Sequence, residues 1–565
     1  MAIIGIDLGT TNSLCCVWKD GKSQLIPNAL GDYLTPSVVG LDDNGQLITG
    51  QPAKDRLQTH PDLSVGNFKR YMGTPKKIRL GKAEFRIEEL AGMLLKSIKQ
   101  DAEEALKEPV EEAVISVPAY FNDAQRKATR LAAQLAGLKV DRLINEPTAA
   151  AIAYGLHHQD DDSTFLVFDI GGGTFDVSVL ELFSGVLQVH AAAGDNSLGG
   201  EDFLDVLLGM MLEQIPLDPA SLDPKQLNYF RKQAETIKKM LSDQNRVEVR
   251  IKYNSSTHSI DISREAFQSR CDELLLRLRS PVERALKDSN IMARDLDAIV
   301  LVGGASRMPM IRSLCAKMFG KMPLMNVDPD QVVALGAGVL TGMLANDEAL
   351  EEIVLTDVAP YTLGTNVVNH NDARSAGALF HPIIERNSPV PVSRSEILYT
   401  ASDYQKKIVI GIYQGEARLA RDNIKLGEIT VQVPPKLQGE ESVDVRFTYD
   451  VNGLLEVEVE VLSSKLKKRA VIEGNPGVMT PKEIEKALAG LASLKVHPRD
   501  QMENSALIAR AERMYEESLG DRRAYLSELT SRFEAILDRQ DPKEIEVARR
   551  QIGEILDEME ESPFI

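Results

Sequence analysis

Two segments that lie far apart in the chain repeat one pattern: an apolar run typical of a buried strand, an aspartate, and a short glycine turn with hydroxyl side chains. The aspartates are Asp7 and Asp169, and the turn residues are Gly9, Thr10, Thr11 and Asn12 in the first segment and Gly171, Gly172, Gly173 and Thr174 in the second. A glycine turn lets backbone N–H groups approach phosphate oxygens, and an aspartate at a strand end can hold a metal ion or its water. The repetition predicts a duplicated fold that holds a nucleoside triphosphate between its halves. Two ordinary hairpin turns with capping aspartates are the less favoured interpretation.

The composition narrows the classes of protein and partner. A chain of 565 residues is long enough for several domains, each with its own core. Its formal net charge of −19 argues against nucleic acids and anionic membranes as partners, although simple solubility explains the charge equally well. The four cysteines (15, 16, 271 and 315) lack metal-ligand spacing, and no apolar run reaches the length of about 18 residues that spans a membrane. We therefore expect a soluble cytoplasmic protein with reduced thiols.

Three kinds of sequence follow one another along the chain. Residues 1 to about 346 alternate strand-like and helix-like patterns, which is typical of an α/β region. Within this region, Asn122 with Gln125 predicts a helix start. Ala128, Leu131 and Leu135 are then expected on one face, and Gly137 is expected to end the helix.

The second kind of sequence begins near residue 360 and predicts an antiparallel sheet. Its clearest signal is a hairpin around Asn452-Gly453, in which apolar residues alternate with polar ones at Val443, Val445 and Phe447 and at Leu455, Val457, Val459 and Val461. The third kind starts at Thr480-Pro481, a helix N-cap. Its apolar stripes are typical of a small helical bundle and comprise Leu526, Leu529, Phe533 and Ile536, then Ile545, Ala548, Ile552 and Ile555. The segment 352–357 between the first two kinds is unusually apolar for a linker, which predicts that it docks onto a neighbouring domain.

Further polar residues fit the chemistry of phosphate transfer, which needs positioning and charge neutralisation. Asp7, Asp169 and Asp176 are candidates to organise a hydrated Mg²⁺. Lys69 is a candidate point charge for a γ-phosphate, and Glu146 is a candidate to orient water, although each taken alone reads as a surface lysine or a helix-capping acid. A third glycine turn, residues 303–307, follows the strand-like run 298–302 and precedes a helix, a context typical of nucleotide contact.

The motifs resemble those of the seventy-kilodalton heat-shock (DnaK-type) chaperone family over almost the whole chain, most closely its HscC-like specialised bacterial members. The residues that carry this resemblance are 5–13, 117–123, 145–150, 169–176 and 198–203. It implies an actin-like two-lobed α/β ATPase domain (1–351), an interdomain linker (352–358), an antiparallel β-sandwich peptide-binding domain (359–475) and a C-terminal α-helical lid (476–565).

The resemblance also implies roles for individual residues. Catalysis would fall to Asp7, Lys69, Glu146, Asp169 and Thr174, with Mg²⁺ held through water by Asp7 and Asp169. The cofactors would be ATP/ADP and Mg²⁺, with K⁺ as a further candidate. Besides the two turns, the nucleotide would contact Glu235, Lys238, Ser242, Gly303, Gly304, Arg307 and Asp330. The interdomain switch would comprise Pro118, Arg126, Val354, Leu355 and Asp357. The peptide site would comprise Val368, Leu398, Ala401, Ile408 and Ile410, for which simple core packing is the alternative.

We therefore expect an ATP-dependent molecular chaperone whose ATPase cycle controls the binding of extended hydrophobic peptide segments. No mobile arginine finger is evident, so a slow basal turnover of about 10⁻⁴–10⁻² s⁻¹ is expected. A J-domain co-chaperone and a nucleotide exchange factor are partners implied by the family alone. Thr356 in the linker, Thr365 and Val368 near the peptide site, and a short stretch at 243–263 depart from the family pattern. A filament-forming actin relative, a small-molecule kinase and a co-regulator that binds ATP without cycling are the alternatives.

Overall fold

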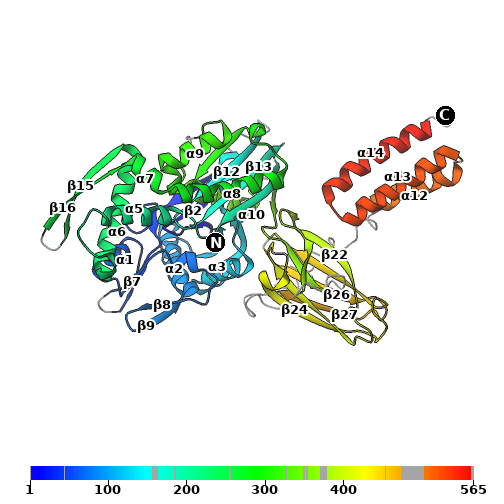
Figure 1. The fold of residues 1–565 in the computed structure, drawn as a ribbon, viewed down its shortest axis with the longest axis horizontal. Coiled ribbons are helices and arrows are strands. Elements are labelled where there is room, and N and C mark those ends of the chain that lie inside the picture. Colours follow the sequence, from blue (N-terminus) through cyan, green and yellow to red (C-terminus); the bar gives the residue numbers. More distant parts are fainter. Residues whose placement is uncertain are drawn as a thin grey trace.

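The computed structural model of the chain is shown in Figure 1. It describes residues 2–42, 45–155, 163–183, 186–253, 256–324, 328–347, 350, 354–368, 378–451, 453–472, 502–518 and 520–561. The predicted N-cap at Thr480-Pro481 and the first two residues of the linker, 352 and 353, lie outside these residues.

The N-terminal region contains two large sheets of related topology. The first has the strand order β11-β10-β1-β2-β3, and β4 also pairs with β2. Its strands are β1 (Ala2–Leu8), β2 (Asn12–Lys19), β3 (Lys22–Ile26), β4 (Thr35–Pro36), β10 (Val110–Val117) and β11 (Lys139–Asn145). β1 runs antiparallel to β2 and parallel to β10, so Asp7 at the end of β1 leads directly into the first glycine turn.

The second sheet repeats this arrangement. Its strand order is β17-β12-β13-β14-β18-β21, with strands β12 (Ser163–Ile170), β13 (Phe175–Phe183), β14 (Val186–Asp195), β17 (Ala298–Val302), β18 (Val354–Val358) and β21 (Pro389–Val390). β12 is antiparallel to β13 and parallel to β17, so Asp169 occupies the same place in its sheet as Asp7 does in the first. The expected duplication is therefore present in the sheet topology.

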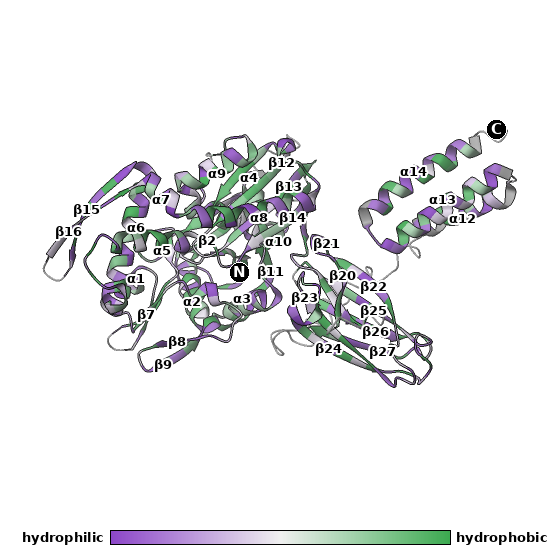
Figure 2. Ribbon diagram, in the orientation of Figure 1, coloured by the Kyte–Doolittle hydropathy of each residue, from purple (hydrophilic) through white to green (hydrophobic). Residues whose placement is uncertain are grey.

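β12 shows why its sequence reads as one apolar run. Successive side chains of a strand point to opposite faces of the sheet. Phe165 and Val167 belong to one hydrophobic cluster, whereas Leu166, Phe168 and Ile170 belong to another. Both faces of β12 are covered, and such strands carry continuous apolar residues rather than an alternating pattern. The strands around β12 and β13 are accordingly green over much of their length in Figure 2.

Helices flank the two sheets in Figure 1: α1 (Gln51–Thr59), α2 (Ile87–Leu106), α3 (Asp123–Leu135), α4 (Glu146–Gly155), α5 (Gly200–Leu212), α6 (Pro224–Asp243), α7 (Arg264–Arg270), α8 (Asp272–Ser289), α9 (Pro309–Phe319) and α10 (Val332–Leu344). Three small sheets complete this region, formed by β5 (Val39–Leu41), β6 (Leu47–Thr49) and β7 (Ser64–Val65), by β8 (Lys77–Leu80) and β9 (Ala83–Arg86), and by β15 (Arg246–Tyr253) and β16 (Ser256–Ser263).

The predicted start of α3 is confirmed, and the helix ends at Leu135, two residues before the predicted stop at Gly137. Asn122 and Gln125 form a capping box at the helix N-terminus. Ala128 is buried, whereas Leu135 is 52% exposed. Leu135 nevertheless lies beside α2, because a Cβ added to Gly92 would be 3.0 Å from Cβ of Leu135.

The C-terminal part of the chain contains a β-sandwich. One sheet has the order β20-β19-β23-β24 and the other β22-β25-β26-β27. The strands are β19 (Leu363–Val367), β20 (Leu379–Ile384), β22 (Val392–Tyr399), β23 (Lys407–Gln414), β24 (Ile424–Gln432), β25 (Ser442–Tyr449), β26 (Leu455–Val461) and β27 (Lys467–Ile472). The predicted hairpin is confirmed as β25 and β26, and all seven of its alternating apolar residues are buried.

The described residues after the sandwich form three helices: α12 (Met502–Glu517), α13 (Gly520–Arg539) and α14 (Pro542–Glu561). They share a hydrophobic cluster that includes the predicted stripes, for example Phe533 on α13 and Ile552 on α14, so the bundle is confirmed for these residues. In Figure 2, α14 shows alternating hydrophobic and hydrophilic bands. Among the described residues, no helix combines the length and the apolar composition needed to cross a lipid bilayer.

Candidate functional site

The two predicted phosphate turns lie against each other. A Cβ atom added to Gly172 would lie 2.1 Å from Oγ1 of Thr11, and one added to Gly173 would lie 3.0 Å from Cγ2 of Thr10. Glycine is therefore required here for close approach rather than for a special backbone angle. The side chain of Thr10 is buried, whereas that of Thr11 is exposed. The turns from the two sheets thus meet, as the sequence pattern predicts.

Hydrogen bonds to backbone groups hold both turns in place. In the second turn the N–H of Gly171 donates to the carbonyl of Thr174 over 3.1 Å, and Gly171 in turn accepts from the N–H of Gly200 at the start of α5 over 2.9 Å. In the first turn the carbonyl of Gly9 accepts a hydrogen bond of 2.7 Å from Oγ of Ser37. Asn12 begins β2 directly after this turn.

Three buried acids (Glu146, Asp169 and Asp176), the half-buried Asp7 and the buried Lys69 lie beside the turns. Nζ of Lys69, in the short helix η1 (Phe68–Tyr71), donates to Oε1 of Glu146 at the start of α4 over 2.8 Å. Oδ1 of Asp7 accepts from Oγ of Ser116 over 2.7 Å. Oδ1 of Asp176 accepts from the N–H of Tyr120 over 2.9 Å.

Burial and mutual repulsion raise the pKa values of these acids. Burial is the largest cause and the charge of Glu146 the second, and together they raise the pKa of Asp7 and that of Asp176 each to about 7. The same two causes raise the pKa of Asp169 well above its usual range. Oδ2 of Asp169 is buried without a hydrogen-bond partner. Since one lysine faces four acids, the donor set fits a hydrated cation, which would supply the missing positive charge.

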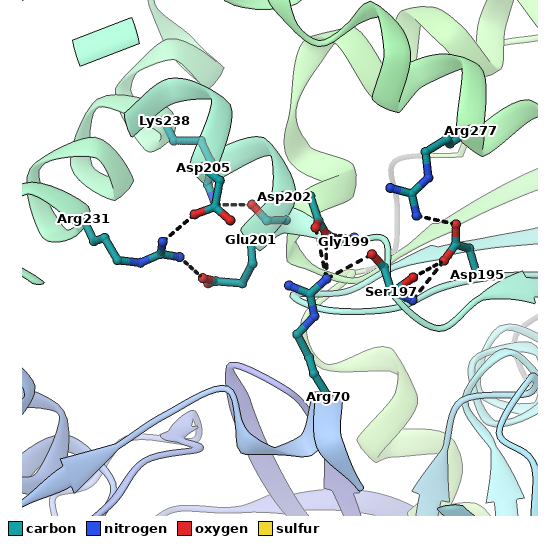
Figure 3. A network of polar contacts seen from close by, with 11 residues as sticks. Arg70, Asp195, Ser197, Gly199, Glu201, Asp202, Asp205, Arg231, Lys238 and Arg277 are labelled. Carbon is teal, nitrogen blue, oxygen red and sulfur yellow. Dashed lines mark hydrogen bonds and ion pairs between the residues drawn. The ribbon is translucent and has the colours of Figure 1, made fainter. Parts of the chain in front are cut away.

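Arg70, next to Lys69 in η1, forms an ion pair with Asp202 of α5. The guanidinium of Arg70 donates to both carboxylate oxygens of Asp202, over 3.1 and 2.9 Å, and to the carbonyl of Ser197 over 3.0 Å. Figure 3 shows Arg70 reaching from its own ribbon toward the N-terminus of α5. Asp202 also caps α5, because it accepts the N–H of Gly199 over 2.7 Å. This ion pair, made by one nitrogen of the guanidinium, joins η1 to α5 beside the phosphate turns.

The residues predicted to contact a nucleoside surround the third glycine turn and α6. Gly303 has a left-handed φ of 80°, and a Cβ there would lie 2.4 Å from the carbonyl oxygen of Ile170, so the third turn abuts the second. Arg307 donates to Asp328 over 2.8 Å and to Asp330 over 2.7 Å. A Cβ on Gly304 would also lie 2.9 Å from Oδ1 of Asp330.

Lys238 links α6 to Gly200, which is hydrogen-bonded to the second turn. It pairs with Glu235 over 2.7 Å and donates to the carbonyl of Gly200 over 3.2 Å. Ser242 lies near the C-terminal end of α6, where its carbonyl accepts from Arg264 over 3.1 Å. The contacts therefore connect Glu235 and Lys238, but not Ser242, to the phosphate turns in the part of the chain that the structure describes.

The linker strand β18 is docked in the second sheet. It runs parallel to β14, with Val354 opposite Val186 and Leu355 opposite Leu187. It also pairs antiparallel with β21 of the C-terminal part. The predicted docking of this apolar segment is therefore present in the structure.

A hydrogen-bonded chain joins the linker to the predicted catalytic residues. Arg126 donates to the carbonyl of Ala119, next to Pro118, over 3.1 Å and to Oδ1 of Asn145 over 2.6 Å. Nδ2 of Asn145 then donates to Oδ2 of Asp357 over 2.7 Å. Asp357 is half-buried, and the loss of solvent around its carboxyl group raises its pKa. Asn145 directly precedes Glu146 in the chain. The linker acid Asp357 therefore bonds the residue next to the buried Lys69–Glu146 pair.

The predicted peptide-site residues belong to the sandwich, apart from the phosphate turns. Ile408 and Ile410 of β23 are buried in its core, and Leu398 packs against the same cluster. Ala401 follows β22, and its N–H donates to Oε1 of Gln405 over 2.9 Å. Val368, which follows β19, is 60% exposed. Core packing therefore accounts for the two isoleucines, whereas it does not account for Val368.

Sequence reasoning assigned no role to Ser116, Arg70 or the side chain of Asn145. A signal for Ser116 exists, because it is the one hydroxyl in the apolar end of β10, and parallel pairing of Ile6 with Ile115 places it beside Asp7. Arg70 offers no such signal, since its partner Asp202 lies 132 residues away.

Comparisons with known proteins give one family, whose model matches nearly the whole chain. A family model described as "Hsp70 protein" matches residues 3–563. The chain is similar to the chaperone protein DnaK of Thermotoga neapolitana, with 41% identity over 486 residues that cover 84% of this chain and 80% of that protein. The DnaK of Thermotoga maritima gives the same values. The DnaK of Thermosipho melanesiensis is 40% identical over 485 residues, with 84% and 80% coverage.

Proposed function

The chain belongs to the Hsp70 family, and on that premise we propose how its residues carry out the family's work. The protein is an ATP-dependent molecular chaperone with ATPase activity. We propose that residues 1–351 form an actin-like two-lobed ATPase domain, 352–358 the linker, 359–475 the peptide-binding sandwich and 476–565 the lid.

In the proposed mechanism ATP lies with its phosphates between the two glycine turns. The buried ammonium of Lys69 neutralises charge on the γ-phosphate, and Glu146 orients the attacking water. Electrostatic stabilisation is strong here because both side chains are buried away from bulk solvent. The hydroxyl of Thr174, buried beside the second turn, is proposed to contact the phosphate or the water.

Members of this family bind ATP and ADP together with Mg²⁺, which neutralises phosphate charge when bound. We propose that Asp7 and Asp169 hold this ion through its waters, and the unpartnered Oδ2 of Asp169 supports this assignment. K⁺ is proposed as a second cation on the same ground, the excess of carboxylates over lysine. Glu235, Lys238, Ser242, Gly303, Gly304, Arg307 and Asp330 are proposed to contact the nucleoside.

One observation carries the proposed coupling between ATP and peptide: Asn145 bonds the linker acid Asp357 and is followed in the chain by Glu146. A change at the γ-phosphate that moves Glu146 would therefore alter the position of Asn145. Pro118 and Arg126 would transmit the same change, since Arg126 bonds both Ala119 and Asn145. We propose that ATP favours the docked linker, and that hydrolysis releases it and closes the lid over a bound peptide.

The peptide site is proposed to use Val368, Leu398, Ala401, Ile408 and Ile410. Burial of one leucine side chain supplies only about 1.5–3 kcal/mol, so backbone hydrogen bonds to an extended peptide would supply the rest. Unfolded hydrophobic segments are the proposed ligands, and a J-domain co-chaperone and an exchange factor the proposed partners. The HscC-like subtype is proposed from the resemblance of the motifs, and a cytoplasmic location from the four free, buried cysteines.

The test is release of a fluorescein-labelled apolar peptide, followed by anisotropy with ATP and with ADP. We expect release to be at least about tenfold faster with ATP, which corresponds to about 1.4 kcal/mol of coupling. Equal release rates with the two nucleotides would contradict the proposed coupling. Lys69→Ala should bind ATP and still release peptide, which separates nucleotide binding from hydrolysis.

A further inference from the structure

The only tryptophan of the chain makes a long-range contact to Asp347, five residues before the linker. Trp18 lies near the end of β2, and its Nε1–H donates to Oδ2 of Asp347 over 2.9 Å. The two residues are 329 positions apart. Asp347 follows α10 and precedes the linker strand β18 by seven residues. The contact therefore ties the first sheet to the segment that leads into the linker.

The backbone around Asp347 is held by the end of α10. Asn346 has a left-handed φ of 54°, and the N–H of Asp347 donates to the carbonyl of Gly342 over 3.1 Å. This six-residue closure is typical of a helix C-terminus. The carbonyl of Asp347 accepts the N–H of Leu350 over 3.0 Å, and Leu350 is buried. These hydrogen bonds fix the backbone of Asp347 to the C-terminal end of α10 and to Leu350.

The indole has a fitted place against α10. A Cβ on Gly342 would lie within 2.5–2.7 Å of three indole carbons, so glycine leaves the space that the ring occupies. Trp18 also packs on a cluster that includes Leu350 and Val358 and against which Leu355 of the linker packs. The ring and the docked linker therefore share one hydrophobic cluster.

β2 connects the first phosphate turn to Trp18. It begins at Asn12, the last residue of the first phosphate turn, and ends one residue after Trp18. We propose that Trp18 is a positioning residue for the linker: its hydrogen bond to Asp347 holds the linker's starting point so that β18 docks beside β14. Trp18 acts through Asp347 and touches no part of the nucleotide site. The proposal rests on the proposed function, because it takes linker docking as the step that the chaperone cycle uses.

The experiment measures cleavage of the full chain by thermolysin, whose products are assigned by mass to cuts within 351–358. Trp18→Phe removes the donor and keeps a ring, and Asp347→Ala removes the acceptor. Asp347→Asn is the matched control, because its side-chain oxygen can still accept the indole N–H. The double variant Trp18→Phe/Asp347→Ala completes a cycle. Each protein is compared with wild type with ATP and without nucleotide.

Loss of one hydrogen bond to a carboxylate should raise linker cleavage about tenfold in each single variant. The double variant should be no worse than either single, and Asp347→Asn should stay close to wild type. ATP affinity and melting temperature should remain near wild-type values, which a general loss of structure would not allow.

Additive effects in the double variant, or an Asp347→Asn variant as labile as Asp347→Ala, would overturn the role of this hydrogen bond. Single variants that cleave at the wild-type rate would do the same. If wild type shows no effect of ATP on cleavage, the proposed function fails. The comparison of variants with wild type under one condition still decides the role of Trp18.

Discussion

The ammonium group of Lys69 lies 2.8 Å from Oε1 of Glu146, and both side chains are almost completely buried. The pair joins η1 to the N-terminus of α4, and its two residues are 77 positions apart in the chain. It stands among Asp7, Asp169 and Asp176, so Lys69 is the one cation bonded inside a set of four acids in the described site. This imbalance is the physical basis for the predictions on catalysis and on Mg²⁺.

Replacing Lys69 should stop hydrolysis and weaken the unliganded fold. We expect Lys69→Met to lower single-turnover hydrolysis at least about 100-fold, because a charge aimed at the transition state is lost. The unpaired Glu146 should cost about 3–5 kcal/mol of stability without nucleotide. Thermal unfolding of the double variant Lys69→Met/Glu146→Gln is the control: it should regain stability and remain inactive. A double variant as unstable as the single would contradict this account.

Removal of Mg²⁺ should lower ATP affinity more strongly than removal of any single carboxylate. With EDTA, the acids face the triphosphate without a compensating cation, so we expect ATP affinity to fall at least tenfold in isothermal titration. Asp169→Asn should reduce this dependence on Mg²⁺, because its partnerless oxygen is the proposed contact to the ion's water. An unchanged dependence in Asp169→Asn would argue against that contact.

Docking of the linker should depend on pH through Asp357. Its usual pKa of 3.8 is raised in the docked state, mainly by burial. The docked form therefore holds a proton more tightly, so docking loses stability as pH rises from about 3.8 to the raised value and is then constant. With ATP present, energy transfer between dyes on the two domains should report a docked fraction that falls with pH in this window. Asp357→Asn should remove this part of the slope, and equal slopes would contradict it.

Close packing of α10 on α4 should make Gly336 intolerant of a methyl group. A Cβ there would lie 1.8 Å from the carbonyl oxygen of Ala149. We expect Gly336→Ala to destabilise the N-terminal region by about 1–3 kcal/mol, measured by urea unfolding. Gly209→Ala on the exposed side of α5 is the matched control, because nothing lies within 4 Å of its added Cβ. It should be neutral or stabilise by about 0.5–1 kcal/mol.

A charge at Val368 should weaken peptide binding without unfolding the sandwich. The side chain is 60% exposed, so Val368→Asp removes little core packing. We expect peptide affinity to fall about tenfold in anisotropy titrations, with the melting temperature unchanged. Ile410→Ala provides the contrast: its buried side chain should cost about 2–5 kcal/mol of stability. Full peptide affinity in Val368→Asp would remove this residue from the proposed site.

Much of the fold could be predicted because local patterns encode it. The paired Asp–glycine turns, the β25–β26 hairpin and the helical stripes depend on residues close in sequence, and the structure contains each of them. Exposure along α3 is less readily predicted. Leu135 shares a face with the buried Ala128 and lies beside Gly92 of α2, yet as the last residue of the helix it stays 52% exposed. The helical period predicts which residues share a face, but the packing of whole elements decides how much of each side chain is covered.

Local residue patterns were enough to predict the two strand–aspartate–glycine turns and a linker apolar enough to dock. Which polar groups meet depends instead on the three-dimensional arrangement: Asp7 with Ser116, Arg70 with Asp202, Asn145 with Asp357, and Trp18 with Asp347. These partners are 109 to 329 residues apart and come from separate parts of the fold. A side-chain hydrogen bond forms only within about 3 Å. Such contacts depend on the placement of whole elements, which no local pattern of residues specifies.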